Sequence, residues 1–284
     1  MPLRGAGGEP ISFARTVHSH GVARLLPARI VEGPPLEYRR TLRVDGAQIT
    51  ITLTQRDGDL QIDSNRRVGR VAKNEIERIV ARMFRFDDNL APFYTMIVND
   101  DRLRWAAAGA GRMLASPTVF EDTIKTICTT NCAWSATIRM TNALAELGDG
   151  AFPEPALIAR TPEAWFKDVA RMGYRGAYVR AIARDVADGS LDLESFLSSA
   201  GRSDDDVEAA LLELPGIGPY GAAHVMQLLG RHRNLVLDSW TRPTFLKIEK
   251  KKQAKDSTIR RVYAKYGDYA GLAFWLMLTH AWTD

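Results

Sequence analysis

Residues 214–223 read LPGIGPYGAA and lie between two stretches with helical periodicity. A helix expected over residues 206–212 runs into this turn, and a second helix is expected to begin with Pro219, where the missing N–H of proline costs nothing. The N–H groups of Gly216 and Gly218 should then point unpaired out of the second helix, forming a seat for a phosphate group. Taken alone, the turn leaves a second interpretation open, because many tight turns between helices contain glycine for steric reasons and bind nothing.

Further along the chain, the apolar run LVL at residues 235–237 ends in a single carboxylate, Asp238, and Trp240 follows two positions later. Residues 172–179 read MGYRGAYV, and residues 120–131 read FEDTIKTICTTN. In this order, these parts resemble the helix-hairpin-helix (HhH-GPD) superfamily of DNA glycosylases, in its bacterial 3-methyladenine glycosylase II and 8-oxoguanine glycosylase branches. The similar segments run from about residue 116 to the end of the chain.

The resemblance implies an α+β fold that is mostly helical and two-lobed, with a small antiparallel β-sheet domain at the N-terminus. Alternating apolar and polar residues over 39–63, broken by two Asp-Gly pairs, independently predict a three-stranded meander. Helical spacing begins at about Lys73. The expected divisions are a sheet domain at residues 1–72, helices at residues 73–115 that join the C-terminal lobe, a helical lobe with the hairpin at residues 116–232, and C-terminal helices with the aspartate at residues 233–284.

The resemblance places the catalytic aspartate of the superfamily at Asp238. Cleavage of an N-glycosidic bond develops positive charge on the sugar, so a nearby carboxylate can stabilise the transition state and orient or deprotonate the attacking water. An aspartate at the end of an apolar run can also simply cap the following helix. The two roles do not exclude each other.

Tyr220 bears on the reaction subtype. In branches of the superfamily that also cleave the strand, a lysine stands at this point and attacks the sugar as an amine. With tyrosine here, the resemblance implies a monofunctional glycosylase that flips a damaged base, hydrolyses its bond and leaves an abasic site. An aromatic ring at this point favours alkylated purines, because the ring can stack on a cationic base. A packing role for Tyr220, and a lyase reaction through Lys247 or Lys250, remain alternatives.

Four other positions complete the expected site. Ile217 belongs to the hairpin with its two glycines, His224 lies four residues after Tyr220 and is expected at the base or sugar, and Trp240 is expected in the pocket wall. Asn131 falls where the family inserts a side chain into the duplex. Packing and helix-capping roles are the simpler interpretations of His224, Trp240 and Asn131. The Thr-Thr-Asn stretch at residues 129–131 resembles the polar stretch of the 8-oxoguanine branch more than the apolar one of the alkylpurine branch.

Charge and composition are compatible with a polyanionic partner. The chain has 284 residues, a net charge of +4 and an isoelectric point of about 9.1. Basic residues crowd the stretch after Asp238, which is explained either as a solvated helix face or as a phosphate contact. These residues are Lys247, Lys250, Lys251, Lys252, Lys255, Arg260 and Arg261. The expected partner is double-stranded DNA with damaged bases, bound by a monomer.

The two cysteines, Cys128 and Cys132, are expected on one face of one helix as reduced thiols. Two thiols cannot hold an iron–sulfur cluster, so neither this cofactor nor any side-chain metal site is expected, and only a backbone-bound monovalent cation at the hairpin stays open. Because the sequence has no apolar run of about 18 residues, no membrane contact is expected, and the expected location is the bacterial cytoplasm, near the nucleoid. Two other functions remain open: a non-catalytic DNA-binding protein, and a glycosylase for oxidised or deaminated bases.

Overall fold

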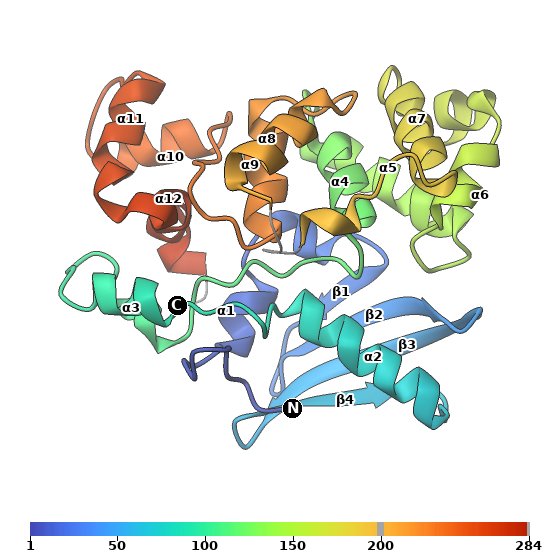
Figure 1. The fold of residues 1–284 in the computed structure, drawn as a ribbon, viewed down its shortest axis with the longest axis horizontal. Coiled ribbons are helices and arrows are strands. Elements are labelled where there is room, and N and C mark those ends of the chain that lie inside the picture. Colours follow the sequence, from blue (N-terminus) through green and yellow to red (C-terminus); the bar gives the residue numbers. More distant parts are fainter. Residues whose placement is uncertain (198–201, 283–284) are drawn as a thin grey trace.

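The computed structural model describes residues 1–197 and 202–282. A small sheet with one long helix across it lies below a layer of shorter helices (Figure 1). The strands are β1 Ala28–Val31, β2 Glu37–Val44, β3 Ala47–Arg56 and β4 Asp59–Ser64. The α-helices are α1 Phe13–Val17, α2 Arg70–Met83, α3 Ala91–Ile97, α4 Val119–Thr129, α5 Trp134–Leu147, α6 Pro155–Arg160, α7 Arg175–Ala187, α8 Asp204–Glu213, α9 Pro219–Leu228, α10 Thr241–Ile248, α11 Asp256–Tyr263 and α12 Ala270–Thr279. Shorter helical turns are η1 Gly21–Arg24, η2 Arg104–Ala108, η3 Trp165–Val169, η4 Glu194–Phe196, η5 Ala264–Tyr269 and η6 His280–Trp282.

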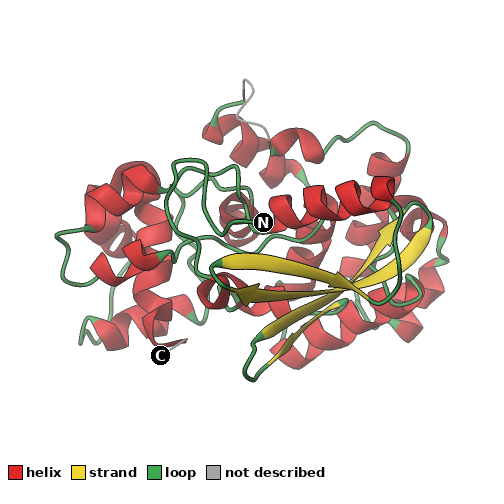
Figure 2. Ribbon diagram, turned by 90° about the horizontal axis from the view of Figure 1, so that it is seen from below, coloured by secondary structure: helices red, strands yellow, loops and turns green. Residues whose placement is uncertain are grey.

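The α+β class is confirmed, and the sheet has one strand more than the sequence predicted. All neighbouring strands are antiparallel in the order β1-β2-β3-β4 (Figure 2). Strands β2, β3 and β4 are joined by Asp45-Gly46 and Asp57-Gly58, and all four of these residues have positive φ, as a tight hairpin turn requires. The prediction missed β1 because four residues directly after a proline are too short to show an alternating pattern.

The described residues form three large apolar cores and one small cluster that includes Leu228, Val236 and Trp275. The sheet shares one core with α1 and α2, so α2 packs on the sheet rather than with the C-terminal helices that the sequence analysis expected it to join. A second core lies among α4 to α9, and a third joins the segment from Leu90 to Ala110 with residues of α10, α11 and α12. None of the described helices is long and apolar enough to cross a membrane.

Helix α4 is held by charges that are buried between the cores. Glu121 pairs with Arg40 of β2 and with Lys125, one turn further along α4, at 2.7 Å. Burial alone would raise the pKa of Glu121, but the two cations lower it overall. A carboxylate in such surroundings is stable only as a paired ion, so these contacts fix how α4 lies on the sheet.

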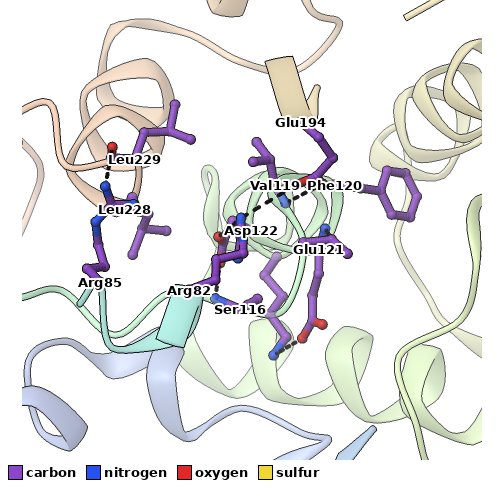
Figure 3. Close-up of polar contacts among 12 residues, drawn as sticks. Arg82, Arg85, Ser116, Val119, Phe120, Glu121, Asp122, Glu194, Leu228 and Leu229 are labelled. Carbon is purple, nitrogen blue, oxygen red and sulfur yellow. Dashed lines mark hydrogen bonds and ion pairs between the residues drawn. The ribbon is translucent and has the colours of Figure 1, made fainter. Parts of the chain in front are cut away.

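Helix α2 braces the two helices that carry the site described below (Figure 3). Arg82, whose side chain is 10% exposed, faces Asp122 of α4 at 3.6 Å and Glu194 of η4 at 3.9 Å. Three residues further on, Arg85 donates to the carbonyl groups of Leu228 and Leu229 at 2.7 and 2.6 Å. An arginine at the last carbonyls of α9 satisfies acceptors that the helix leaves free and complements its dipole.

Candidate active site

One cleft gathers most of the residues that the sequence analysis selected. Its volume is about 540 Å³, and it lies where α9, the loop after α4, the start of α7 and the start of α10 meet. The cleft is lined by Thr129, Thr130, Asn131, Cys132, Tyr174, Tyr178, Gly216, Gly218, Pro219, Tyr220, Gly221, Leu237, Asp238, Ser239 and Arg242. The volume is of the size that small-molecule sites have.

The hairpin forms one wall of the cleft. Ile217 turns into the core and anchors the loop, and Pro219 is the first residue of α9. Gly216 has φ of +85°, and a side chain there would stand 2.7 Å from the ring of Tyr178. Among the residues that the structure describes, no acceptor pairs with the N–H group of Gly216 or Gly218. Both groups are therefore available to an anion, as the sequence predicts.

Asp238 is oriented by the helix that it caps. Its Oδ1 atom accepts from the N–H groups of Trp240 and Thr241 at 2.8 and 2.6 Å, and its own N–H donates to the hydroxyl of Thr241 at 2.8 Å. The Oδ2 atom makes no hydrogen bond within the described part of the chain, and the residue lines the cleft. Capping thus holds one oxygen and leaves the other unpaired, so the geometry is compatible with both roles considered for Asp238, and the catalytic role stays a prediction.

Tyr220 lies beside this carboxylate on the first turn of α9. Its hydroxyl is 3.2 Å from the hydroxyl of Thr129, which comes from the last turn of α4. Burial raises the pKa of Tyr220, and the nearby charge of Asp238 adds to this. The phenol is therefore neutral at physiological pH. No lysine is among the described residues that line the cleft, so the cleft itself presents no side-chain amine to a sugar.

The loop after α4 carries Asn131 into the cleft in a strained conformation. Asn131 has φ of +46°, which is uncommon for a residue with a side chain. Arg175, at the start of α7, holds the loop: its guanidinium donates to the carbonyl of Thr130 and, at 3.1 Å, to that of Asn131. The same guanidinium lies 4.6 Å over the ring of Tyr174. Arg175 is therefore a positioning residue for Asn131.

The structure does not place His224 or Trp240 in this cleft. His224 is buried behind Tyr220, with ring centroids 6.2 Å apart, and touches His20 edge-on at 5.5 Å. Burial lowers the pKa of His224 to about 3 and that of His20 to about 4, so both are neutral at physiological pH. Trp240 instead packs with Trp275 and Trp282.

Several residues that line the cleft or support its loops were not selected from the sequence. Arg175 and Tyr178 lie within the MGYRGAYV segment, but only the fold shows that they support the loop after α4 and the hairpin. Thr129 lies within the Thr-Thr-Asn stretch, and no sequence pattern indicates that its hydroxyl contacts the hydroxyl of Tyr220. Arg242, one residue after Thr241, reaches the cleft because α10 starts there.

The cysteines differ from the expectation of one shared helix face. Cys128 lies in α4, where burial raises its pKa to about 12, whereas Cys132 lies in the loop beyond the end of the helix. Across residues 1–197 and 202–282, no three histidine, cysteine or acidic side chains are arranged to hold a metal ion. A monovalent cation at the hairpin would rest on backbone carbonyl groups and stays a prediction.

Comparisons with known proteins found two similar curated proteins and several similar solved structures. No protein-family model matches the chain. A protein of Methanothermobacter thermautotrophicus named "Probable N-glycosylase/DNA lyase" is 24% identical over 281 residues, which cover 87% of this chain and 86% of that protein. A "DNA-3-methyladenine glycosylase" of Bacillus subtilis is 26% identical over 178 residues, covering 58% of this chain and 57% of that protein.

Solved structures match over nearly the whole length. The 3-methyladenine DNA glycosylase of Archaeoglobus fulgidus has a TM-score of 0.75 and 15% identity, covering 100% of this chain and 99% of its own. The 8-oxoguanine glycosylase/lyase of Clostridium acetobutylicum has a TM-score of 0.72 and 16% identity, covering 96% and 94%. Its complex with double-stranded DNA matches with a TM-score of 0.67 and 16% identity, covering 89% and 87%. This chain has the fold of the helix-hairpin-helix DNA glycosylases.

Proposed function

We propose that this protein is a monofunctional DNA N-glycosylase of base excision repair that acts on alkylated purines. The observation that carries the proposal is the free oxygen of Asp238 in the same cleft as the unpaired N–H groups of Gly216 and Gly218. A carboxylate stabilises a sugar cation, while a helix amino terminus binds a phosphate. The two groups together fit one nucleotide of a DNA strand. The similar proteins named above are also DNA glycosylases, and one of them was solved with double-stranded DNA.

The reaction needs one water molecule and no covalent intermediate. The bond between C1′ and the base nitrogen breaks, and the base leaves with the bonding electrons. The Oδ2 atom of Asp238 stabilises the resulting positive charge on the sugar and accepts a proton from the water that attacks C1′. The products are a free base and an abasic site on an intact strand.

Two features favour alkylated purines as the substrate class. A cationic methylated purine is already a good leaving group, so it needs neither a lysine nucleophile nor a strong general acid. The ring of Tyr220 borders the cleft, and aromatic faces attract cations.

Asn131 enters the duplex and fills the gap left by the flipped base.

A second candidate is a glycosylase/lyase for 8-oxoguanine. The polar Asn131 and the name of the similar Clostridium acetobutylicum protein favour it, and the name of the Methanothermobacter protein favours a lyase without naming a base. It requires an amine in the cleft, and the described lining has no lysine there. A third candidate, a non-catalytic DNA-binding protein, accounts for the hairpin but leaves the free carboxylate oxygen without a role.

The test is base release from duplex oligonucleotides that carry 7-methylguanine, hypoxanthine, 8-oxoguanine or uracil, with and without alkali. The proposal predicts strand breaks only after alkali, strongest with the methylated purine. Breaks at 8-oxoguanine without alkali, accompanied by a covalent adduct on borohydride reduction, would establish the lyase instead. Binding without release from any duplex would favour the non-catalytic protein.

A further inference from the structure

A group of exposed lysines lies directly beyond the proposed active site and takes no part in it. The five side chains are on residues 247–255, at the end of α10 and in the loop to α11, here called the lysine segment. They are Lys247, Lys250, Lys251, Lys252 and Lys255. None of them forms an ion pair with another residue of the described chain. Their charges therefore face solvent without a partner.

The two acids within and next to the lysine segment are paired with arginines. Glu249, inside the segment, forms an ion pair with Arg102 at 2.6 Å. Asp256, the first residue of α11, accepts from Nε and Nη2 of Arg242 at 2.8 Å. Neither acid therefore forms an ion pair with any of the five lysines.

The lysine segment is an ordered turn and not a loose tail. The N–H group of Lys251 donates to the carbonyl of Leu246 at 2.9 Å, and that of Lys250 donates to the carbonyl of Lys247 at 3.3 Å. Ala254 packs against the third apolar core, which includes residues of α10, α11 and α12. The backbone is thus ordered before binding, so a polyanion that binds the lysine side chains does not also have to order the main chain.

The position of the segment points to a specific polyanion. Arg242 lines the cleft and is also the residue that holds Asp256, so the cleft and the segment are joined by one ion pair. Helix α10 has 8 residues and is therefore about 12 Å long. Asp238 lies just before its first residue, and the lysine segment begins at its last turn, so about this length separates the two. In duplex DNA this length corresponds to roughly three to four base pairs, at about 3.4 Å per step.

We propose that the lysine segment binds phosphate groups of the duplex that flanks the target nucleotide, as a second backbone contact separate from the hairpin. The proposal rests on the proposed function for its choice of DNA over another acidic partner. Such contacts add affinity and register without reading sequence, so they act equally on damaged and undamaged duplex.

The experiment measures duplex affinity against salt concentration for the full chain and for K250Q/K251Q/K252Q. Each lost phosphate contact lowers the slope of log affinity against log salt by about 0.9, so the slope should fall by about 2 to 3 on undamaged and methylated duplexes alike. The matched control is R66Q/R67Q/R70Q, which removes the same charge from exposed positions just before α2 and at its first residue. Helix α2 lies on the sheet, away from α10 and α11 (Figure 1). The control should keep the slope of the unchanged protein.

An equal fall of slope in both variants would overturn the proposal, because the effect would then come from net charge alone. An unchanged slope in K250Q/K251Q/K252Q would overturn it too, and binding of a labelled poly-glutamate peptide by the segment would then identify an acidic protein as the partner. Circular dichroism melting curves check that both variants fold. The readout is separate from catalysis: absence of base release by the unchanged protein would sink the proposed function, whereas the slopes would still test the lysine segment on undamaged DNA.

Discussion

The two ends of α4 show two different uses of polar groups. Near its start, Glu121 is buried against Arg40 and Lys125, so charges inside the protein satisfy one another. Beyond its last turn, Asn131 borders a cleft in which the hairpin N–H groups and one oxygen of Asp238 find no partner among the described residues. Buried ion pairs stabilise the fold, whereas unpaired polar groups that line a cleft are available to bind a ligand. Substitutions at the first end should change stability, and substitutions at the second should change DNA binding or base release.

The largest effect is expected for Glu121→Gln. The substitution leaves Arg40 and Lys125 buried without their counter-ion, and breaking a buried pair costs about 3–5 kcal/mol. Urea denaturation measures the loss. The control is Glu75→Gln, which breaks an exposed ion pair with Arg78 and should cost less than about 1 kcal/mol. Equal losses in the two variants would contradict the structural role of the buried pair.

Gly216→Ala and Gly218→Ala form a matched pair in the hairpin. Gly216 has a left-handed conformation and lies against Tyr178, so the methyl group should cost about 1–3 kcal/mol of stability and weaken duplex binding. Gly218 is extended, and open space surrounds the position of its side chain, so the free energy of unfolding should change by less than about 0.5 kcal/mol. Comparable destabilisation by both would mean that the hairpin geometry is wrong.

The buried histidines behind Tyr220 predict a pH dependence of stability. Their folded pKa values, about 3 for His224 and about 4 for His20, lie below the usual value of about 6.5. As the pH falls, the two histidines therefore take up protons in the unfolded chain before they do so in the folded protein. Their contribution to the free energy of unfolding is complete above about pH 6.5 and is lost as the pH falls toward 4. His224→Gln should reduce the loss between pH 7 and pH 5 by roughly 1–2 kcal/mol. The same change at the exposed His280 is the control, and an equal reduction there would refute the assignment.

The smallest effect is expected for Arg175→Lys. Lysine keeps the charge but lacks the planar fork that holds two carbonyl groups of the loop carrying Asn131. The catalytic efficiency of base release should fall by about threefold to tenfold, with the loss in kcat because the flipped state is less well supported. Arg184→Lys, at an exposed position of the same helix, is the control and should leave both kcat and KM unchanged. A loss confined to KM would show that Arg175 contributes only to binding.

Sequence patterns predicted the parts of the molecule that depend on local chemistry. The hairpin, the capping geometry of Asp238 and strands β2 to β4 all follow from glycine, proline and alternation signals within a few residues. Strand β1 was missed, since a four-residue strand carries too little pattern. The sequence also could not indicate that His224 faces His20, because that contact joins residues about 200 positions apart. The contacts of Arg175 and Arg82 are likewise tertiary, and only packing reveals them.

Asp238 is the residue on which the proposed reaction depends most, and single-turnover base release by Asp238→Asn tests its role most directly. Asparagine caps a helix as well as aspartate does, so α10 and the fold should be retained. On a 7-methylguanine duplex the rate should fall by about 10²- to 10³-fold, the scale of losing an electrostatic group at a transition state, while duplex affinity stays within about threefold. Base release at the unchanged rate would contradict the proposed reaction, since the free oxygen of Asp238 would then have no catalytic role.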